Sequence, residues 1–199
     1  MIFISRLLLS RMEMIQERII DEYGIHQLVY GLFPSGANRD FLYFVDYGDH
    51  LSGVSIIIQS HSVPDHCRIG RIQTKEIPDA FFQRKSYYFQ MRINPVVKKD
   101  GHLLRIENRS SEAIEWLCRR ADTMGVVFSI DSMDKKAGGV LRMRRKADGR
   151  SISISYVDIV GCLRVIDRDR FLTVVNNGFG AHKGFGFGLL QLWPLKEEK

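Results

Sequence analysis

The C-terminal segment, residues 178–194, reads GFGAHKGFGFGLLQLWP and carries five glycines within eleven positions. Glycine has no Cβ, so the backbone of such a loop can turn with positive φ or approach a ligand closely. Successive exposed backbone N–H groups form a concavity that binds anions, and Lys183 adds a full positive charge. The apolar residues 189–193 read as a buried strand. We therefore expect residues 178–188 to form a phosphate-binding loop anchored to a sheet.

The spacing of these glycines excludes two familiar nucleotide-binding motifs. A dinucleotide fingerprint, Gly-x-Gly-x-x-Gly, lies between a strand and a helix, but here Lys183 occupies the third glycine position and a strand follows. No glycine is followed by a Lys-Ser or Lys-Thr pair, so a P-loop is excluded as well. A glycine-rich hairpin without a ligand remains the alternative interpretation of this segment taken alone.

Length and composition place the chain among globular proteins. Its 199 residues are enough for one medium domain or two small ones, and 45% of them are hydrophobic. No apolar run reaches 18 residues, so no membrane span is expected. The apolar N-terminus contains Arg6 and lacks a small-residue cleavage site, which argues against a signal peptide and favours a strand. We expect a cytoplasmic protein.

The cysteines and histidines indicate neither a disulfide framework nor a metal site. The three cysteines are odd in number and none lies in a Cys-x-x-Cys pair, which indicates reduced thiols. His61, His66 and Cys67 are close in sequence, but a structural zinc site usually has four ligands and no second pair is present. We therefore expect no metal and no other cofactor.

The positive charge is concentrated in one stretch. The net charge of the chain is +6, a moderate preference for a polyanionic partner. Residues 135–150 carry one acidic residue against seven basic ones: Lys135, Lys136, Arg142, Arg144, Arg145, Lys146 and Arg150. Residues 147–149 (ADG) lie between two alternating segments, and Asp-Gly in that setting is a strong hairpin signal. A basic β-hairpin is predicted here.

The remaining pattern predicts two similar units. In the first, a helix is expected at residues 13–32, no clear second helix is present, and strands are expected at 1–10, 41–45, 54–59, 71–77 and 87–94. In the second, helices are expected at 111–124 and 167–176, and strands at 103–106, 126–130, 140–146, 150–156, 157–166 and 189–193. We predict an α+β fold of two tandem ferredoxin-like (RRM-like) βαββαβ domains, residues 1–94 and 95–199. Such sheets are a known platform for single-stranded RNA, although fold alone does not give function.

The first predicted helix carries a candidate catalytic pair. Tyr23, His26 and Tyr30 are spaced i, i+3 and i+7, so they share a stripe beside the core-facing one. The spacing alone favours a half-buried polar edge of an amphipathic helix. Combined with the basic hairpin and the Gly/Lys loop, it favours metal-independent RNA cleavage. RNA supplies its own nucleophile, the 2′-OH, while Tyr and His can act as base and acid and Lys or Arg can stabilise charge.

Several motifs in this order resemble the CRISPR-associated repeat endoribonucleases of the CasE type, members of the RAMP superfamily in type I-E systems. The matching stretches are residues 26–28 (HQL), 32–34 (LFP), 39–43 (RDFLY), 57–60 (IIQS), 89–95 (FQMRINP), 161–165 (GCLRV) and 178–190 (GFGAHKGFGFGLL). The last is the glycine-rich loop of the superfamily, and it is the most specific of them.

The resemblance implies recognition of the stem-loop in CRISPR repeat transcripts and metal-free cleavage at the 3′ base of the stem. It implies products with a 2′,3′-cyclic phosphate and a 5′-OH, and an enzyme that stays bound to the mature guide RNA as a subunit of Cascade. The catalytic residues of the family map to Tyr23 and His26. The resemblance does not assign which of the two is the base and which is the acid. The RNA-binding positions are Arg39, Arg142, Arg144, Arg145, Lys146, Arg150, Gly178, Gly180, His182 and Lys183.

One departure from the family keeps two alternatives open. Some relatives have a Lys five residues after the catalytic His, where this chain has Gly31. The candidates to stabilise charge in its place are Lys183, His182 and Arg39, and the sequence does not rank them. A first alternative is therefore a catalytically inactive subunit that binds guide RNA. A second is a general RNA-binding module outside CRISPR systems.

Overall fold

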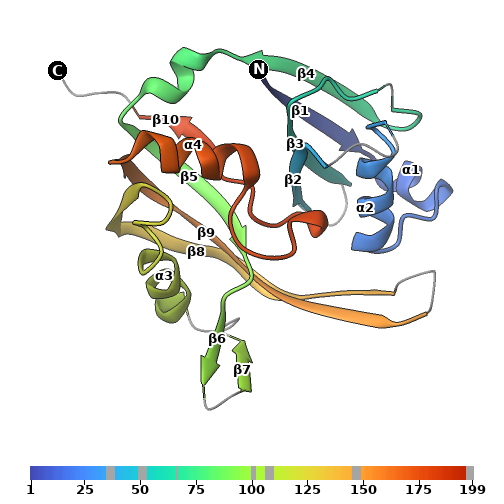
Figure 1. The fold of residues 1–199 in the computed structure, drawn as a ribbon. Coiled ribbons are helices and arrows are strands. Elements are labelled where there is room, and N and C mark those ends of the chain that lie inside the picture. Colours follow the sequence, from blue (N-terminus) through green and yellow to red (C-terminus); the bar gives the residue numbers. More distant parts are fainter. Residues whose placement is uncertain are drawn as a thin grey trace.

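The computed structural model describes residues 1–34, 39–48, 53–65, 67–99, 102–105, 110–144 and 149–195. These residues form two four-stranded antiparallel sheets, with helices packed on them, and one small two-stranded sheet (Figure 1). The structure confirms the predicted α+β fold with two ferredoxin-like units.

The first sheet has the strand order β2-β3-β1-β4. Its strands are β1 (Ile2–Leu9), β2 (Phe41–Asp46), β3 (Val54–Ser60) and β4 (Arg71–Ile77). Helix α2 (Glu22–Tyr30) connects β1 to β2 and packs Ile25 and Val29 into a core with Leu7, Ile56 and Ile58. Between β3 and β4, the described residues contain no helix, which agrees with the weak second helix of the prediction.

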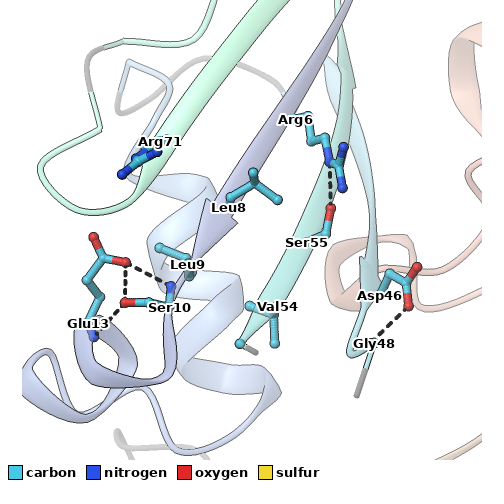
Figure 2. Close-up of a pocket in the computed structure, with 11 residues that line it drawn as sticks. Arg6, Leu8, Leu9, Ser10, Glu13, Asp46, Gly48, Val54, Ser55 and Arg71 are labelled. Carbon is cyan, nitrogen blue, oxygen red and sulfur yellow. Dashed lines mark hydrogen bonds between the residues drawn. The ribbon is translucent and has the colours of Figure 1, made fainter. Parts of the chain in front are cut away.

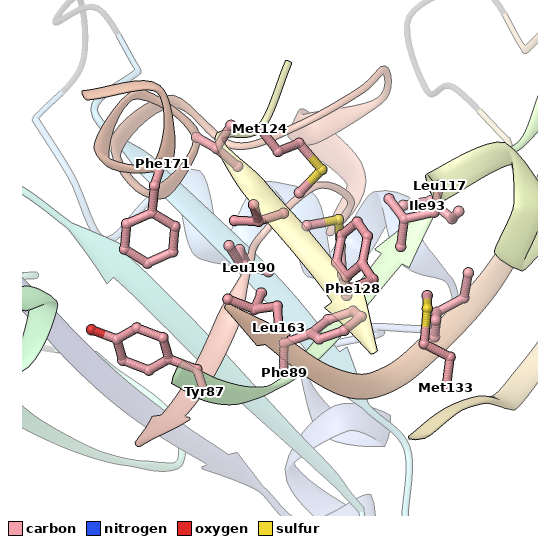
Figure 3. Packing of buried hydrophobic residues seen from close by; sticks show 14 of the residues in the cluster. Tyr87, Phe89, Ile93, Leu117, Met124, Phe128, Met133, Leu163, Phe171 and Leu190 are labelled. Carbon is pink, nitrogen blue, oxygen red and sulfur yellow. The ribbon is translucent and has the colours of Figure 1, made fainter. Parts of the chain in front are cut away.

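The second sheet repeats the arrangement, with the order β10-β5-β9-β8. Its strands are β5 (Ser86–Ile93), β8 (Val126–Arg144), β9 (Ser151–Val165) and β10 (Gln191–Pro194). Helices α3 (Ser110–Cys118) and α4 (Arg168–Asn177) supply Leu117 and Phe171 to its core, where they meet Phe89 and Leu163 (Figure 3). A small hairpin, β6 (Val96–Lys99) and β7 (His102–Arg105), is inserted after β5.

The first predicted helix is divided in two. Residues 13–32 were expected to form one helix, but the chain forms α1 (Arg11–Gln16) and then α2. Arg18 between them has φ 53, a left-handed conformation that cannot continue a helix. Asp21 then caps α2 by accepting a hydrogen bond from the Gly24 N–H (3.0 Å). This break sets the direction of α2 independently of α1.

The predicted basic hairpin is longer than expected. The sequence indicated separate strands at 126–130 and 140–146, but β8 runs without interruption from Val126 to Arg144, with pairing shifts between Ser129/Asp134 and Lys135/Ala137. Its pairing with β9 continues to Arg144↔Ser151, beyond the part of β9 that pairs with β5. The two strands therefore leave the sheet as a two-stranded arm that reaches toward α2 (Figure 1).

The boundary between the units is displaced from the predicted position. The sequence placed it between residues 94 and 95, yet β5 lies before that point and pairs with β9 and β10 in the second sheet. We propose a boundary in the connection between β4 and β5, which contains the short 3₁₀ helix η1 (Asp79–Gln83). The strand pattern alone could not distinguish a fourth strand of one unit from the first strand of the next.

The two units meet on the face of the first sheet opposite α2. Leu42 and Phe44 of β2 pack there against Leu189. Arg92 of β5 forms a buried bidentate ion pair with Asp158 of β9 (2.7 and 2.8 Å), and its guanidinium carbon lies 4.7 Å from the centroid of the Phe44 ring. This contact fixes the position at which the segment after α4 meets the first unit.

Candidate active site

The glycine-rich loop and helix α2 meet at one backbone carbonyl. His26 is half-buried on α2, and its Nδ1–H donates a hydrogen bond to the carbonyl oxygen of Gly184 (2.7 Å). The hydroxyl of Tyr43, a buried residue of β2, donates to the same oxygen (2.7 Å). The sequence singled out His26 and the loop separately, and the structure brings them into direct contact.

The loop adopts the compact backbone that its glycines allow. The 3₁₀ turn η2 (Lys183–Phe185) is preceded by His182 with φ 60 and followed by Gly186 with φ 82. A Cβ at position 186 would lie 3.2 Å from the Tyr43 ring, so glycine permits both the positive φ and the close approach. The Phe185 ring then stacks on His26 with a centroid distance of 5.0 Å.

Two further side chains, those of Tyr30 and Arg39, approach the same position. A Cβ at position 184 would lie 3.2 Å from Tyr30 Oη, 3.5 Å from Arg39 Nη1 and 3.9 Å from His26 Cε1. The ring centroids of Tyr30 and His26 are 4.1 Å apart. Tyr30 was placed on the stripe of His26 but was not predicted as a site residue, although its spacing of four residues was the available signal.

Tyr23 lies on the other side of His26, with 5.8 Å between ring centroids. It is half-buried against a small apolar cluster that includes Leu141, Met143 and Phe187. This cluster joins α2, the arm and the glycine-rich loop, so Tyr23 contributes to packing as well as to the surroundings of His26.

The loop carries two basic side chains, Lys183 and His182, whose pKa values are both lowered. Burial lowers the pKa of Lys183, and the nearby Arg39 guanidinium lowers it further. Burial also lowers the pKa of His182, whose ring contacts Phe187 edge-on at 5.9 Å and has no described contact with His26. Arg39 and Lys183 therefore supply the positive charge beside Gly184.

The two glycines among the predicted RNA-binding residues, Gly178 and Gly180, differ in environment. Gly178 caps the C-terminus of α4 with φ 69, and a Cβ there would lie 2.8 Å from Leu42 Cδ2. Packing between the units thus explains this glycine without a ligand. Gly180 has φ 82 and open space beside it, as a loop exposed to a ligand requires.

The outer end of the basic arm, where β8 ends at Arg144, is fixed against the start of α2. The Arg144 backbone N–H donates to Asp21 Oδ2 (3.2 Å), and its Nε donates to the Gly149 carbonyl (3.1 Å). Arg142 on β8 and Arg150, which directly precedes β9, are exposed. Arg145 and Lys146, also predicted to bind RNA, lie outside the described residues.

A separate cleft of about 520 Å³ lies at the end of the first sheet where β1 leads into α1 (Figure 2). None of the predicted site residues lines it. Its polar side chains bond locally: Ser10 with Glu13 in a capping box, and Arg6 Nε with Ser55 Oγ (3.1 Å). These contacts serve the local fold.

The part of the chain that the structure describes contains no group of three His, Cys, Asp or Glu side chains suited to a metal ion. His66, one of the three residues weighed as ligands from the sequence, is outside that part. No described helix is long and apolar enough to cross a membrane.

A family model described as CRISPR associated protein matches residues 2–194. The chain belongs to this family of CRISPR-associated proteins. It is 27% identical over 190 residues to the CRISPR system Cascade subunit CasE of Escherichia coli (strain K12), covering 88% of this chain and 93% of CasE.

Two solved structures share the fold of this CRISPR-associated protein. One is Thermus thermophilus Cse3 bound to an RNA representing a pre-cleavage complex, with a TM-score of 0.81, 20% identity and coverage of 97% of this chain and 99% of Cse3. The other is Cas6e from Escherichia coli K-12, with a TM-score of 0.66, 24% identity and coverage of 98% and 100%. Both likenesses extend over both ferredoxin-like units.

Proposed function

We propose that this protein is a CRISPR repeat endoribonuclease. It binds the stem-loop of the repeat transcript, cleaves at the 3′ base of the stem and remains bound to the mature guide RNA as a Cascade subunit. The observation that carries the proposal is the contact of His26 with the glycine-rich loop, beside Arg39 and on a helix whose start is bonded to a basic arm. The names of the similar proteins, a Cascade subunit and a structure of an RNA pre-cleavage complex, support the same class of substrate.

The proposed reaction uses the 2′-OH of the RNA as nucleophile. A base removes the 2′-OH proton, a bond forms between O2′ and phosphorus, and the bond from phosphorus to O5′ breaks. An acid delivers a proton to the leaving 5′-oxygen. The products are a 2′,3′-cyclic phosphate and a 5′-OH, and the balance requires no metal. Tyr23 and His26 are the proposed proton donor and acceptor, because both can transfer protons and their rings are neighbours.

Arg39 is the best-placed residue to stabilise the charge that develops on the phosphate. Its Nη1 lies 3.5 Å from the place that a Cβ of Gly184 would occupy, where Tyr30 and His26 also meet. A guanidinium keeps its charge at neutral pH and donates several hydrogen bonds, whereas burial and Arg39 lower the pKa of Lys183. Arg39 thus supplies the charge that a Lys at the position of Gly31 supplies in some relatives.

The RNA stem is proposed to lie along the arm. Arg142 and Arg144 face solvent on β8, and Arg150 does so just before β9, where they can contact stem phosphates. The scissile phosphate then lies between α2 and the exposed part of the glycine-rich loop around Gly180. A cytoplasmic location follows from this RNA substrate.

The test is incubation of the purified protein with its cognate repeat RNA in EDTA. We expect cleavage at the 3′ base of the stem, with a cyclic phosphate on the upstream product. Activity lost on chelation and restored by a divalent cation would contradict the metal-free mechanism. Tight binding to the repeat without cleavage would instead support an inactive guide-RNA-binding subunit, and equal affinity for unrelated hairpins would support a general RNA-binding module.

A further inference from the structure

We infer that Tyr43 is a positioning residue that, through the carbonyl of Gly184, holds the His26 proton on Nδ1 and presents Nε2 as the proton acceptor. The consequence of this tautomer for catalysis rests on the proposed function. Its evidence is the geometry of three residues that come from α2, β2 and the glycine-rich loop.

The tautomer follows from the chemistry of the acceptor. A backbone carbonyl has two lone pairs and no proton, so it can only accept. The 2.7 Å contact between Gly184 O and His26 Nδ1 therefore requires a proton on Nδ1. A neutral imidazole has one N–H and one lone pair, so Nε2 is the unprotonated nitrogen. In the resting state His26 is thus arranged to accept a proton through Nε2.

The hydroxyl of Tyr43 donates a hydrogen bond to the second lone pair of the same oxygen. It is 1% exposed, lies in the core between Phe41 and Val45 of β2, and its hydroxyl can only donate to a carbonyl. Burial raises the pKa of Tyr43, so the hydroxyl keeps its proton. The Gly184 carbonyl is therefore attached to a rigid strand and does not depend on His26 for its position.

The consequence is a division of roles between the two catalytic candidates. His26 Nε2 takes the proton of the 2′-OH, and the cation so formed keeps its Nδ1–H bond to Gly184, which becomes charge-assisted and stronger. The proton for the leaving 5′-oxygen then comes from a different group, and Tyr23, whose ring lies 5.8 Å from that of His26, is assigned to it.

The experiment compares ¹⁵N NMR spectra of the imidazole of His26 in the full-length wild type, Tyr43→Phe and Tyr47→Phe. Tyr47→Phe is the control, because it removes the hydroxyl of a second, half-buried tyrosine that follows β2, one that donates to Glu22 of α2 (2.5 Å) and not to Gly184. We expect the Nδ1–H tautomer in the wild type and in Tyr47→Phe, and a growing share of the Nε2–H tautomer in Tyr43→Phe.

Cleavage and binding of the repeat RNA by the same three proteins complete the test. We expect single-turnover cleavage by Tyr43→Phe to slow by roughly 10- to 100-fold, the effect of a misplaced catalytic group, with an unchanged Kd for RNA. A wild-type Nε2–H tautomer, or a Tyr43→Phe protein with wild-type tautomer and rate, would overturn the inference. A wild type that cleaves no repeat RNA would contradict the proposed function, and the tautomer comparison would still decide the role of Tyr43.

Discussion

Gly184 lies where four side chains meet, and its lack of a Cβ leaves room for all of them. Its carbonyl accepts from His26 and Tyr43, while Tyr30 and Arg39 lie within 3.5 Å of the space that a Cβ would occupy. Glycine at this position is therefore explained by the close approach of functional groups. The sequence marked the loop by its glycine content, but it could not indicate which glycine faces the catalytic helix.

Replacing Gly184 by Ala is expected to impair chemistry more than folding. The added methyl must shift Tyr30, since its contact of 3.2 Å with the Tyr30 hydroxyl is tight, and no positive φ adds strain at this position. We expect single-turnover cleavage to fall by roughly tenfold or more. Gly31→Ala is the control, because Gly31 has αR geometry at the end of α2 and a Cβ there contacts only backbone oxygens at 3.4 Å. Equal rates for the two variants would contradict this role of Gly184.

At the scale of single elements, the arm formed by β8 and β9 is the element that we propose to connect RNA binding to the candidate active site. Along its outer part, exposed Arg142 and Arg144 alternate with buried Leu141 and Met143, which pack in one cluster with Tyr23. The Asp21–Arg144 contact ties it to the first turn of α2. Under the proposed function, these contacts would hold a stem bound along the arm at a fixed distance from His26.

Arg142→Ala is expected to weaken RNA binding without slowing the bound enzyme. Loss of one phosphate contact should reduce the slope of log K against log salt by about 0.7–0.9 and should act alike on different stem sequences. Arg119→Ala provides the control, since Arg119 is an exposed arginine of similar charge that follows α3 and pairs with Glu115. A salt titration of Kd for both variants is the measurement. An unchanged slope for Arg142→Ala would place the stem elsewhere.

The sequence predicted most elements of the fold, and its errors have local causes. Hydrophobic alternation located the strands, and Asp167 indicated the N-cap of α4, where it accepts from the Arg170 N–H (3.1 Å). The break before α2 was missed because the left-handed Arg18 has no glycine or proline to mark it. The arm was divided in the prediction because Gly138 and Gly139 interrupt the pattern of β8.

At the scale of the molecule, the buried Arg92–Asp158 pair is the polar centre of the contact between the units. Both side chains are at most 5% exposed, and the Arg92 guanidinium lies between the rings of Phe44 and Tyr156. A buried charge without its partner is strongly unfavourable. The pair therefore makes the second sheet sensitive to any change at the face it shares with the first.

Asp158→Ala is expected to destabilise the protein by about 3–5 kcal/mol, because it leaves the Arg92 guanidinium buried without its partner. The matched control is Arg119→Ala, which breaks an ion pair whose side chains are 64% and 60% exposed and should change stability by less than about 1 kcal/mol. Urea unfolding of both variants measures the difference. Similar losses in the two proteins would contradict the assigned importance of the buried pair.

The relation between distant segments could not be predicted from local patterns. His26 and Gly184 are 158 residues apart, and their contact depends on how two separately folded units pack. The assignment of β5 to the second unit depends on long-range pairing for the same reason. The residue types at the site were visible in the sequence, while Tyr30 and Tyr43 became site residues only through this packing.

Single-turnover cleavage of the cognate repeat RNA by His26→Ala, with RNA affinity measured in parallel, tests the central claim most directly. His61→Ala is the control, since that exposed histidine contacts the carbonyl of Met1. The proposed function predicts that His26→Ala cleaves at least about 10²-fold more slowly than the wild type, with unchanged Kd, while His61→Ala behaves as the wild type. Cleavage by His26→Ala at the wild-type rate would contradict it.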